Sequence, residues 1–266
     1  MSRPMRLLLA AISVIAVGIG VGVLHQGPAD AAHGQYGYYY FYGTAGQTLD
    51  SEGTRARLSI AAPRVGERGH HSLAQLSVSD SGSHRQVIEV GWMVDESLYG
   101  EAGPHFFVHR WVDGAYLENG EHCYNRCGFV PLADSTVRAG GSLTAGGSAV
   151  FTIRHFAQPA GWWIGYDGQW VGHYPDSLWN GTFTQGGRNQ WFGEVSAEST
   201  TPGCTQMGTG VAASSSGAAT ITGITNFVGN ASEAADISVS ASDPEYYGVH
   251  RLGVDGMRYG GTGGCG

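Results

Sequence analysis

The apolar segments of this chain are short, and their length is the strongest constraint on its fold. From residue 54 onward each apolar run soon stops at a group of Gly, Ser, Asp or Pro. Strands end in this way, whereas the apolar period of about 3.6 residues that marks a helix is absent after residue 24. Glycine contributes 44 of the 266 residues, which suits many tight turns. We therefore predict an all-β fold, an antiparallel β-sandwich of two packed sheets.

The predicted strands combine apolar, aromatic and β-branched residues between turn signals. They cover residues 55–61, 73–78, 86–94, 106–112, 149–156, 162–166, 169–174 and 190–196, with two or three more after residue 218. Asp167 and Gly168 separate two aromatic runs and predict a hairpin turn. Residues 175–179 resemble a helical turn.

Residues 1–31 have the pattern of a signal peptide. Arg3 and Arg6 precede an uncharged apolar stretch over residues 7–24, and Ala29-Asp30-Ala31 fits a cleavage site. The alternative is an uncleaved membrane anchor, because about 18 apolar residues just reach across a bilayer as a helix. The A-x-A pattern favours cleavage, so we predict a secreted, extracellular protein that leaves the membrane when the signal peptide is removed.

The rest of the chain divides into a flexible N-terminal arm over residues 32–53 and one domain over residues 54–266. The arm is rich in Tyr and Gly and has no core pattern. A formal net charge of −8 argues against binding to nucleic acid or to an anionic membrane surface. Lysine is absent from the sequence, which excludes Schiff-base chemistry on a lysine. We expect a monomer.

Four cysteines fit an exported protein, because an oxidising compartment favours disulfides over free thiols. Three pairings of Cys123, Cys127, Cys204 and Cys265 are conceivable. We expect Cys123 to pair with Cys127 across a small local loop and Cys204 to pair with Cys265. A zinc site made from these cysteines is the weaker interpretation, because the usual paired spacing is missing.

Two glutamates stand out among the acidic residues because each lies in the middle of a predicted strand. Glu89 is flanked by apolar residues and Gly91, and Glu194 by aromatic residues and Gly193. An ionised acid inside an apolar strand is unfavourable unless it is paired or solvated in a cleft. Two such acids side by side would leave one protonated and one ionised, the arrangement for adding water to a carbonyl. The alternative is that each points into solvent from an open sheet face.

The histidines are scattered and give weaker signals. His105 and His109 share one face of a predicted strand, so a metal site is conceivable, but two packed or exposed histidines are the preferred interpretation. His70 and His71 precede a strand and read most simply as a polar turn. The motifs of zinc proteases, serine hydrolases and P-loop proteins are absent from the sequence.

Six segments resemble the neprosin family, in that family's order. Ile-Glu-Val-Gly-Trp at 88–92 resembles its I-E-A-G-W motif, and Phe-Gly-Glu-Val at 192–195 resembles W-G-G-E-V. Thr-Gln-Met-Gly-Thr-Gly at 205–210 resembles T-Q-M-G-S-G. The other similar segments are residues 54–63 with 71–78, residues 122–130, and residues 162–166 with 171–179.

The resemblance implies a β-sandwich glutamic peptidase that acts on peptide or protein substrates at acid pH. The glutamates of the family's motifs fall on Glu89 and Glu194, which implies that these two are the catalytic pair. No cofactor and no metal are implied. Some members cleave after proline, but no residue of this chain can be assigned to a proline pocket.

Two other functions fit the same residues. A β-sandwich glycoside hydrolase could use the same two glutamates on an aromatic-lined sheet. A non-catalytic carbohydrate- or cell-wall-binding module could stack sugar rings on Trp162, Trp163 and Trp170, although we expect these aromatic residues to lie in the sandwich core.

Overall fold

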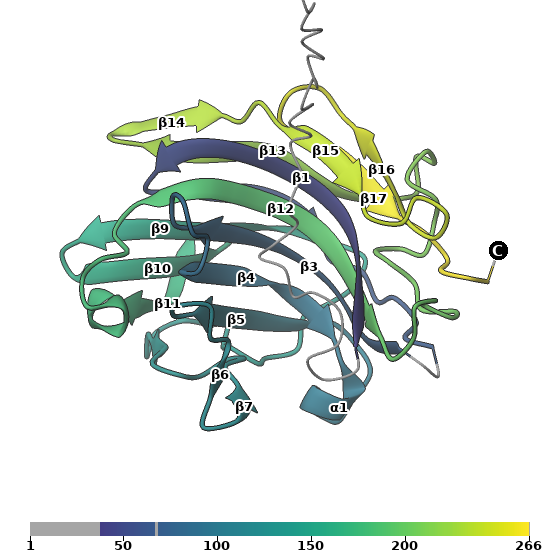
Figure 1. The fold of residues 1–266 in the computed structure, drawn as a ribbon, viewed down its shortest axis with the longest axis horizontal. Coiled ribbons are helices and arrows are strands. Elements are labelled where there is room, and N and C mark those ends of the chain that lie inside the picture. The colour runs from purple at the N-terminus through teal and green to yellow at the C-terminus, as the bar shows by residue number, and fades with distance from the viewer. Residues whose placement is uncertain (1–37, 67–68, 266) are drawn as a thin grey trace, which may run out of the picture.

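The computed structural model describes residues 38–66 and 69–265 and consists of two large antiparallel sheets (Figure 1). The first sheet has the order β15-β1-β12-β3-β4-β5. Its strands are β1 (Tyr39–Ser51), β3 (Gly69–Ser79), β4 (Val87–Val94), β5 (His105–Trp111), β12 (Gly186–Ala197) and β15 (Ser238–Ala241).

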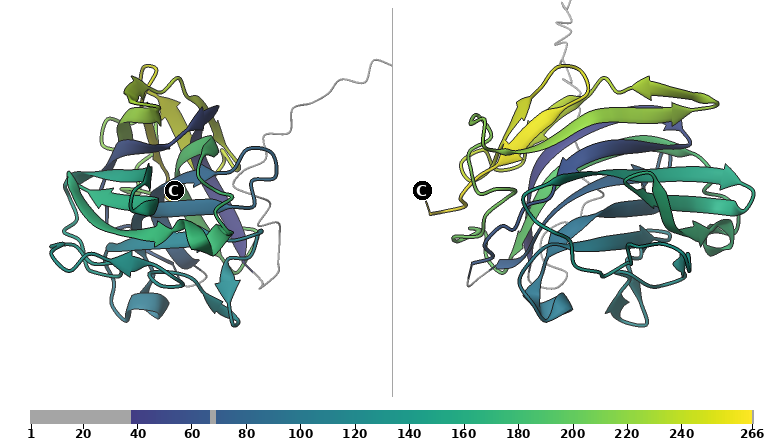
Figure 2. Two further views of the ribbon diagram at one scale, coloured as in Figure 1. Left: turned by 90° about the vertical axis from the view of Figure 1, so that its left-hand side faces the viewer. Right: turned by 180° about the vertical axis from the view of Figure 1, so that it is seen from behind.

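The second sheet has the order β16-β17-β13-β2-β9-β10-β11-β8, with β14 paired to β13. Its strands are β2 (Gly53–Ser59), β8 (Val130–Pro131), β9 (Ser148–Ala157), β10 (Ala160–Tyr166), β11 (Gln169–Pro175), β13 (Ala219–Val228), β14 (Ala231–Ala234), β16 (Gly248–Arg251) and β17 (Met257–Gly260). A small hairpin of β6 (Leu117–Glu118) and β7 (Glu121–His122) lies along the same lower edge of the molecule as α1 (Glu96–Tyr99) (Figures 1 and 2). The segment η1 (Asp176–Trp179) is a 3₁₀ helix. The prediction of an antiparallel β-sandwich is confirmed.

The main core lies between the two sheets and follows from the alternation of side chains along each strand. On β4, Ile88, Val90 and Trp92 are buried toward the other sheet, and Trp191 on β12 does the same. Trp162 is also buried here, as predicted for the core. The opposite register would turn these residues outward, so the apolar pattern fixes the pairing of the strands.

The outer face of the first sheet is also buried at its centre. Leu73, Met93, Phe107 and Phe192 form a separate apolar cluster there, and Tyr42, Tyr99 and Tyr124 pack against it. These residues alternate with the core residues on β3, β4, β5 and β12. A polar side chain on this face therefore lies among apolar and aromatic neighbours rather than in open solvent.

The prediction of a flexible arm over residues 32–53 is wrong for the part that the structure describes. Residues 39–51 form β1, which pairs with β12 along nearly its whole length, from Tyr39 opposite Ala197 to Gly46 opposite Gln190. Phe41 and Ala45 are buried in the core, while the tyrosines beside them point to the outer face. The tyrosine-rich composition concealed this alternation. The predicted signal peptide lies outside the described residues.

Local turn predictions agree with the structure. Asp167 and Gly168 both have positive φ, 45° and 84°, between the paired strands β10 and β11, as a two-residue hairpin turn requires. The helical turn predicted at 175–179 is η1. The short helix α1 was not expected; the Asp95 side chain caps its N-terminus and Gly100 ends it with φ 75°. Within the described residues, no helix is long and apolar enough to cross a membrane.

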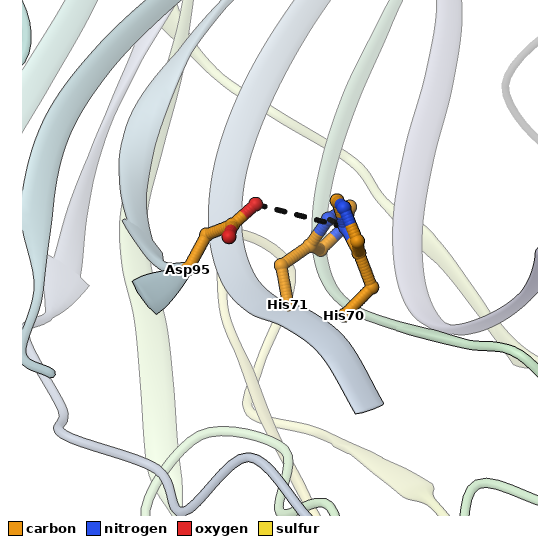
Figure 3. Close-up of side chains that lie close together, drawn as sticks. All are labelled: His70, His71 and Asp95. Carbon is orange, nitrogen blue, oxygen red and sulfur yellow. Dashed lines mark hydrogen bonds and ion pairs between the residues drawn. The ribbon is translucent and has the colours of Figure 1, made fainter. Parts of the chain in front are cut away.

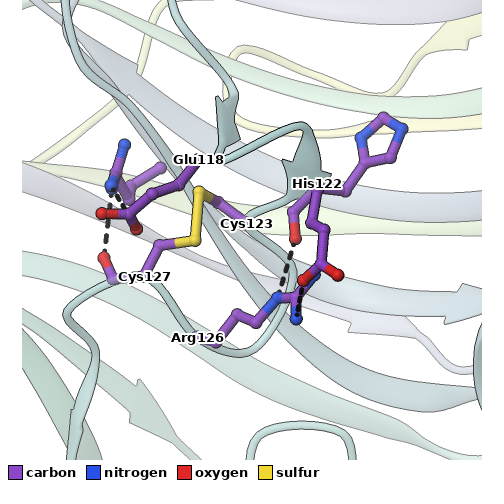
Figure 4. The surroundings of a disulfide bond; sticks show 7 residues. Glu118, His122, Cys123, Arg126 and Cys127 are labelled. Atoms are coloured by element: carbon purple, nitrogen blue, oxygen red, sulfur yellow. Dashed lines mark hydrogen bonds and ion pairs between the residues drawn. A yellow bond between two sulfur atoms is a disulfide. The ribbon is translucent and has the colours of Figure 1, made fainter.

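The expected disulfides are confirmed: Cys123 is bonded to Cys127, and Cys204 to Cys265. Figure 4 shows the first in its loop, where Arg126 donates a hydrogen bond to the carbonyl of His122. Arg110 binds the carbonyl of Cys127 and the carboxylate of Glu118, which ties this loop to β5.

The two disulfides close loops of very different length, with separations of 4 and 61 residues. Chain-entropy arguments give about 2 kcal/mol for the short loop and about 4 kcal/mol for the long one. We therefore predict that Cys204→Ser/Cys265→Ser lowers the free energy of unfolding more than Cys123→Ser/Cys127→Ser does. Urea denaturation of both double variants checks this, and an equal or reversed order would contradict it.

Candidate active site

Glu89 on β4 and Glu194 on β12 lie on the same outer face of the first sheet, on either side of β3. Glu89 is opposite Ser77 of β3, and Glu194 is opposite Leu73 of the same strand. Gln75 lies on that face between these two positions. Both glutamates are buried, with exposed fractions of 7% and 8%. The interpretation that each points from an open face into solvent is therefore wrong.

Glu89 is surrounded by hydrogen-bonding side chains. Its Oε1 accepts a hydrogen bond from Gln75 Nε2 at 3.0 Å. Its Oε2 lies 3.0 Å from His109 Nδ1 and accepts a longer hydrogen bond, at 3.4 Å, from Trp111 Nε1. The amide nitrogen of Gln75 and the indole nitrogen of Trp111 can only donate hydrogen bonds, so both stabilise negative charge on the Glu89 side chain.

Glu194 has a different environment. Its Oε1 lies 2.7 Å from Nε2 of His71, a residue of β3 whose side chain is only 3% exposed. Among the described residues no hydrogen bond to its Oε2 is formed, although this atom is not sealed away from solvent. Glu194 therefore keeps one oxygen available for a substrate or a water molecule.

A glycine lies close to each glutamate for a steric reason. A Cβ atom on Gly91 would lie 2.0 Å from the carbonyl oxygen of Ala74, so the close approach of β4 to β3 beside Glu89 requires glycine. A Cβ on Gly193 would lie 2.3 Å from the ring of Tyr259. The glycines seen in the sequence therefore allow the close packing around the two acids.

The histidine interpretations need two corrections. His71 is not part of a polar turn, because it lies in β3 and contacts Glu194. His105 and His109 do share one face of β5 and are packed, as the preferred interpretation held. The two histidines contact different partners. His109 contacts Glu89. The ring of His105 stacks on that of Tyr99 with the centroids 4.0 Å apart, and its Nε2 lies 3.0 Å from Oε1 of Glu101. In the described part of the chain, the groups able to hold a metal include neither of them.

The alternation of residues along β3 is a sequence signal that predicts these partners. On β3, His71, Gln75 and Ser77 alternate with the core residues Ala74 and Leu76. Polar residues at alternate positions of a strand with one apolar face indicate a second, polar environment on the other face.

Two partly buried tyrosines, Tyr42 and Tyr124, pack against the apolar cluster beside the glutamates. The loss of solvent around each hydroxyl raises its pKa well above the ordinary value, and the charges of Glu194 and Glu89 raise both further. Each tyrosine therefore keeps its hydroxyl proton at acid and neutral pH. A neutral phenol can donate a hydrogen bond to a developing negative charge.

A small pocket adjoins Glu89 on the side away from Glu194. Its lining includes Ser77, Trp111 and Gln190, and its volume of about 10 Å³ is close to the space of one water molecule. Gln190 is buried, and its Nε2 has no hydrogen-bond partner among the described residues. The pocket thus combines a carboxylate with an unused donor.

Next to Glu194, the side chains of His71 and Asp95 lie close to His70. Nδ1 of His70 lies 3.2 Å from Nδ1 of His71 and 3.6 Å from Oδ2 of Asp95 (Figure 3). Burial lowers the pKa of His70, and the neighbouring His71 lowers it further. This group and the site of Glu194 share the ring of His71.

Comparison with solved structures gives distant matches, one of which reaches a TM-score of 0.50 and shows a shared fold. A scytalido-glutamic peptidase bound to a transition-state analogue inhibitor matches with a TM-score of 0.50 and 11% identity. A second structure of that peptidase, with a peptide-based analogue, gives 0.48 and 12%, and SCP-B, an eqolisin-family peptidase in complex with the tripeptide Ala-Ile-His, gives 0.47 and 11%. Each match covers 85% of this chain and 99% of the other.

A model of one protein family also matches the sequence. The family is described as Neprosin, and the match runs over residues 68–262. It includes the strands β4 and β12 with Glu89 and Glu194, and most of the segments whose motifs resemble that family. Because the match spans well over half of the sequence, the chain belongs to the neprosin family of peptidases.

Proposed function

We propose that this protein is an endopeptidase of the glutamic type, with Glu89 and Glu194 as its catalytic residues. The observation that carries the proposal is the placement of two buried glutamates on one sheet face, each in contact with a buried histidine. Structural carboxylates seldom occur as such a pair in an apolar face, because burying each one is unfavourable. Membership of the neprosin family supports the same chemistry.

The surroundings of the two glutamates differ, and this difference suggests their roles. Donors face both oxygens of Glu89, so we assign it the ionised form that accepts a proton from water. Glu194 has one oxygen without such a donor, so we assign it the protonated form that faces the substrate carbonyl. Gln75 and His71 hold the two carboxyl groups from the intervening strand.

The reaction then runs without a covalent enzyme intermediate. Glu89 removes a proton from water while Glu194 donates a hydrogen bond to the carbonyl oxygen of the peptide. The oxyanion that forms when water adds can also receive a hydrogen bond from a neutral tyrosine hydroxyl, such as that of Tyr124. The proton taken by Glu89 passes to the leaving amine, which breaks the C–N bond. No step calls on a metal or a cofactor.

Three finer properties belong to the proposal. The substrates are peptides or unfolded proteins, since an endopeptidase needs a chain that can lie along the sheet face; cleavage after proline is one specificity to examine. The two disulfides fit an oxidising compartment, and with the signal-peptide pattern of residues 1–31 they support secretion. We also propose that the protein acts as a monomer.

The tryptophans do not favour the carbohydrate-binding alternatives. Trp162 lies in the core between the sheets. Trp163 and Trp170 lie outside that core, so the core expectation is wrong for these two residues. They are partly buried in the second sheet, and their rings meet at 72°, so together they form no flat surface for a sugar ring.

The first prediction concerns the catalytic pair. Glu89→Gln and Glu194→Gln should each lower kcat on casein by ~10³-fold or more, because both acids act in one transition state. Glu233→Gln, an exposed glutamate of β14, is the matched control and should retain full activity. Circular dichroism checks that each variant folds. Activity retained in either active-site variant, or release of sugar from xylan by the wild-type protein, would contradict the proposal.

The second prediction separates the roles of the two acids. A peptide leaves as an amine and needs a proton, whereas an activated aryl ester leaves without one. We expect Glu89→Gln to lose at least about 10-fold less activity on an aryl ester than on the peptide with the same acyl part, because Glu89 also delivers the proton to the leaving amine. Glu194→Gln should lose the same factor on both substrates, because the carbonyl oxygen of each needs its hydrogen bond. The reverse pattern in steady-state assays would exchange the two assignments.

The third prediction is the pH profile of the wild-type protein. The active form has one proton on the glutamate pair, and this proton is lost at higher pH, while a second is gained at lower pH. Activity should therefore follow a bell with its maximum at roughly pH 3–5 and should be low at pH 7.5. EDTA should not reduce activity at the maximum. A maximum near neutrality, or a loss of acid-pH activity in EDTA, would show that the pair does not work in this way.

A further inference from the structure

The start of β3 contains an irregularity that places two consecutive histidines side by side. His71 is opposite Ser196 of β12, but the next pair along β12 joins Ala197 to Gly69, so His70 is an extra residue without a partner in the register. Such a bulge re-aims a side chain that would otherwise point to the opposite face. It brings Nδ1 of His70 to 3.2 Å from Nδ1 of His71.

The spacing of these nitrogens suits a tetrahedral cation. Zinc bonds to imidazole nitrogen at about 2.0–2.1 Å, so two ligand atoms of one tetrahedral ion lie about 3.3–3.4 Å apart. The nitrogens of the two histidines are 3.2 Å apart, and Oδ2 of Asp95 is 3.6 Å from the first of them. One ligand atom from each residue lies within 4.8 Å of the other two. A cation at the centre of this triangle would contact all three with little movement.

The remaining atoms of two of these side chains already have partners. Oδ1 of Asp95 accepts hydrogen bonds from the Leu98 amide at 3.0 Å and from the Ser97 hydroxyl at 2.6 Å, which leaves Oδ2 facing the histidines. Nε2 of His71 lies 2.7 Å from Oε1 of Glu194. In metal sites a histidine is commonly held in this way, with a carboxylate on the ring nitrogen that does not bind the metal.

We propose that His70, His71 and Asp95 form a binding site for a zinc-type divalent cation, through both Nδ1 atoms and Oδ2. Two imidazoles and one carboxylate select zinc or a similar transition metal over magnesium and calcium, which prefer oxygen ligands alone. Three protein ligands leave a fourth position for water. The carboxylate of Asp95 supplies the negative charge that favours a cation here.

The site goes beyond the proposed peptidase function, because the cation takes no part in peptide hydrolysis. The cation site and the proposed peptidase site share one residue, His71, which contacts His70 through Nδ1 and Glu194 through Nε2. A cation on Nδ1 leaves the ring proton on Nε2, which then donates to Glu194. At neutral pH the metal would therefore fix the orientation and the tautomer of the His71 ring, while peptide hydrolysis at acid pH proceeds without the ion.

Calorimetric titration of the purified protein with ZnCl₂ tests the proposal. The experiment is run at pH 7, where imidazole is largely neutral, on protein without a metal-binding affinity tag. We expect one zinc ion per chain. His70→Gln and Asp95→Asn should each weaken binding by at least about 10-fold, since each removes a ligand. Asparagine can still cap α1, so Asp95→Asn preserves the local fold.

The control variant is His250→Gln, an exposed histidine of β16 remote from the site in the sheet order, which should bind zinc as the wild type does. MgCl₂ should give no binding, and Co²⁺ should give the visible absorption of a four-coordinate ion. The proposal is overturned if the wild type does not bind zinc, or if neither His70→Gln nor Asp95→Asn weakens binding. Thermal melting checks that both variants are folded.

The measurement does not depend on peptidase activity, so it separates this proposal from the proposed function. Glu89→Gln should bind zinc as tightly as the wild type. An inactive wild-type protein that binds zinc would refute the peptidase alone, and an active one that does not bind zinc would refute the metal site alone.

Discussion

Burial of two acidic side chains in an apolar sheet face is the interaction on which the rest of this structure depends. A carboxylate in such a place is unfavourable unless donors replace the water it has lost. β3 supplies a hydrogen-bond partner to each: Gln75 donates to Glu89, and the His71 ring contacts Glu194. The strand lies between β12 and β4, so a shift of one residue in its register would withdraw both donors and expose the core residues on its other face.

The shared face also explains why the neighbourhood of the site is aromatic. Tyr42 packs against Phe192 and Tyr124 against Phe107, so both rings cover the apolar cluster beside the two acids. Their burial is the main reason that the pKa of each hydroxyl is raised. The same packing therefore covers an apolar patch of the fold and lowers the effective dielectric around the two glutamates.

Much of the fold could be predicted from the sequence because the apolar runs and turn residues are local signals. The strands around Glu89 and Glu194, the turn at Asp167 and the helical turn after Pro175 all follow from such signals. β1 could not be found in this way, because its tyrosines and glycines are stabilised by pairing with a strand far along the chain.

The candidate site was predictable in part, for the same reason. Each glutamate was conspicuous beside its glycine, and the glycines are explained by backbone and ring contacts. The roles of His71 and His109 depend on which strands become neighbours, and no local pattern contains that information. His70 reaches His71 only through a bulge, which is a property of the pairing with β12 and not of β3 alone.

The position of β1 has a consequence for how the chain acquires its structure. Its strand partners are β12 and β15, so Tyr39 pairs with Ala197, and Gly46 pairs with both Gln190 and Ser238. The first strand of the described chain therefore cannot be incorporated until most of the polypeptide is available to it. Contacts between such distant segments make folding slow, because a long loop must close before any of its contacts is gained. Synthesis must therefore pass residue 197 before β1 can complete its pairing with β12, and residue 241 before β15 can cover its other edge.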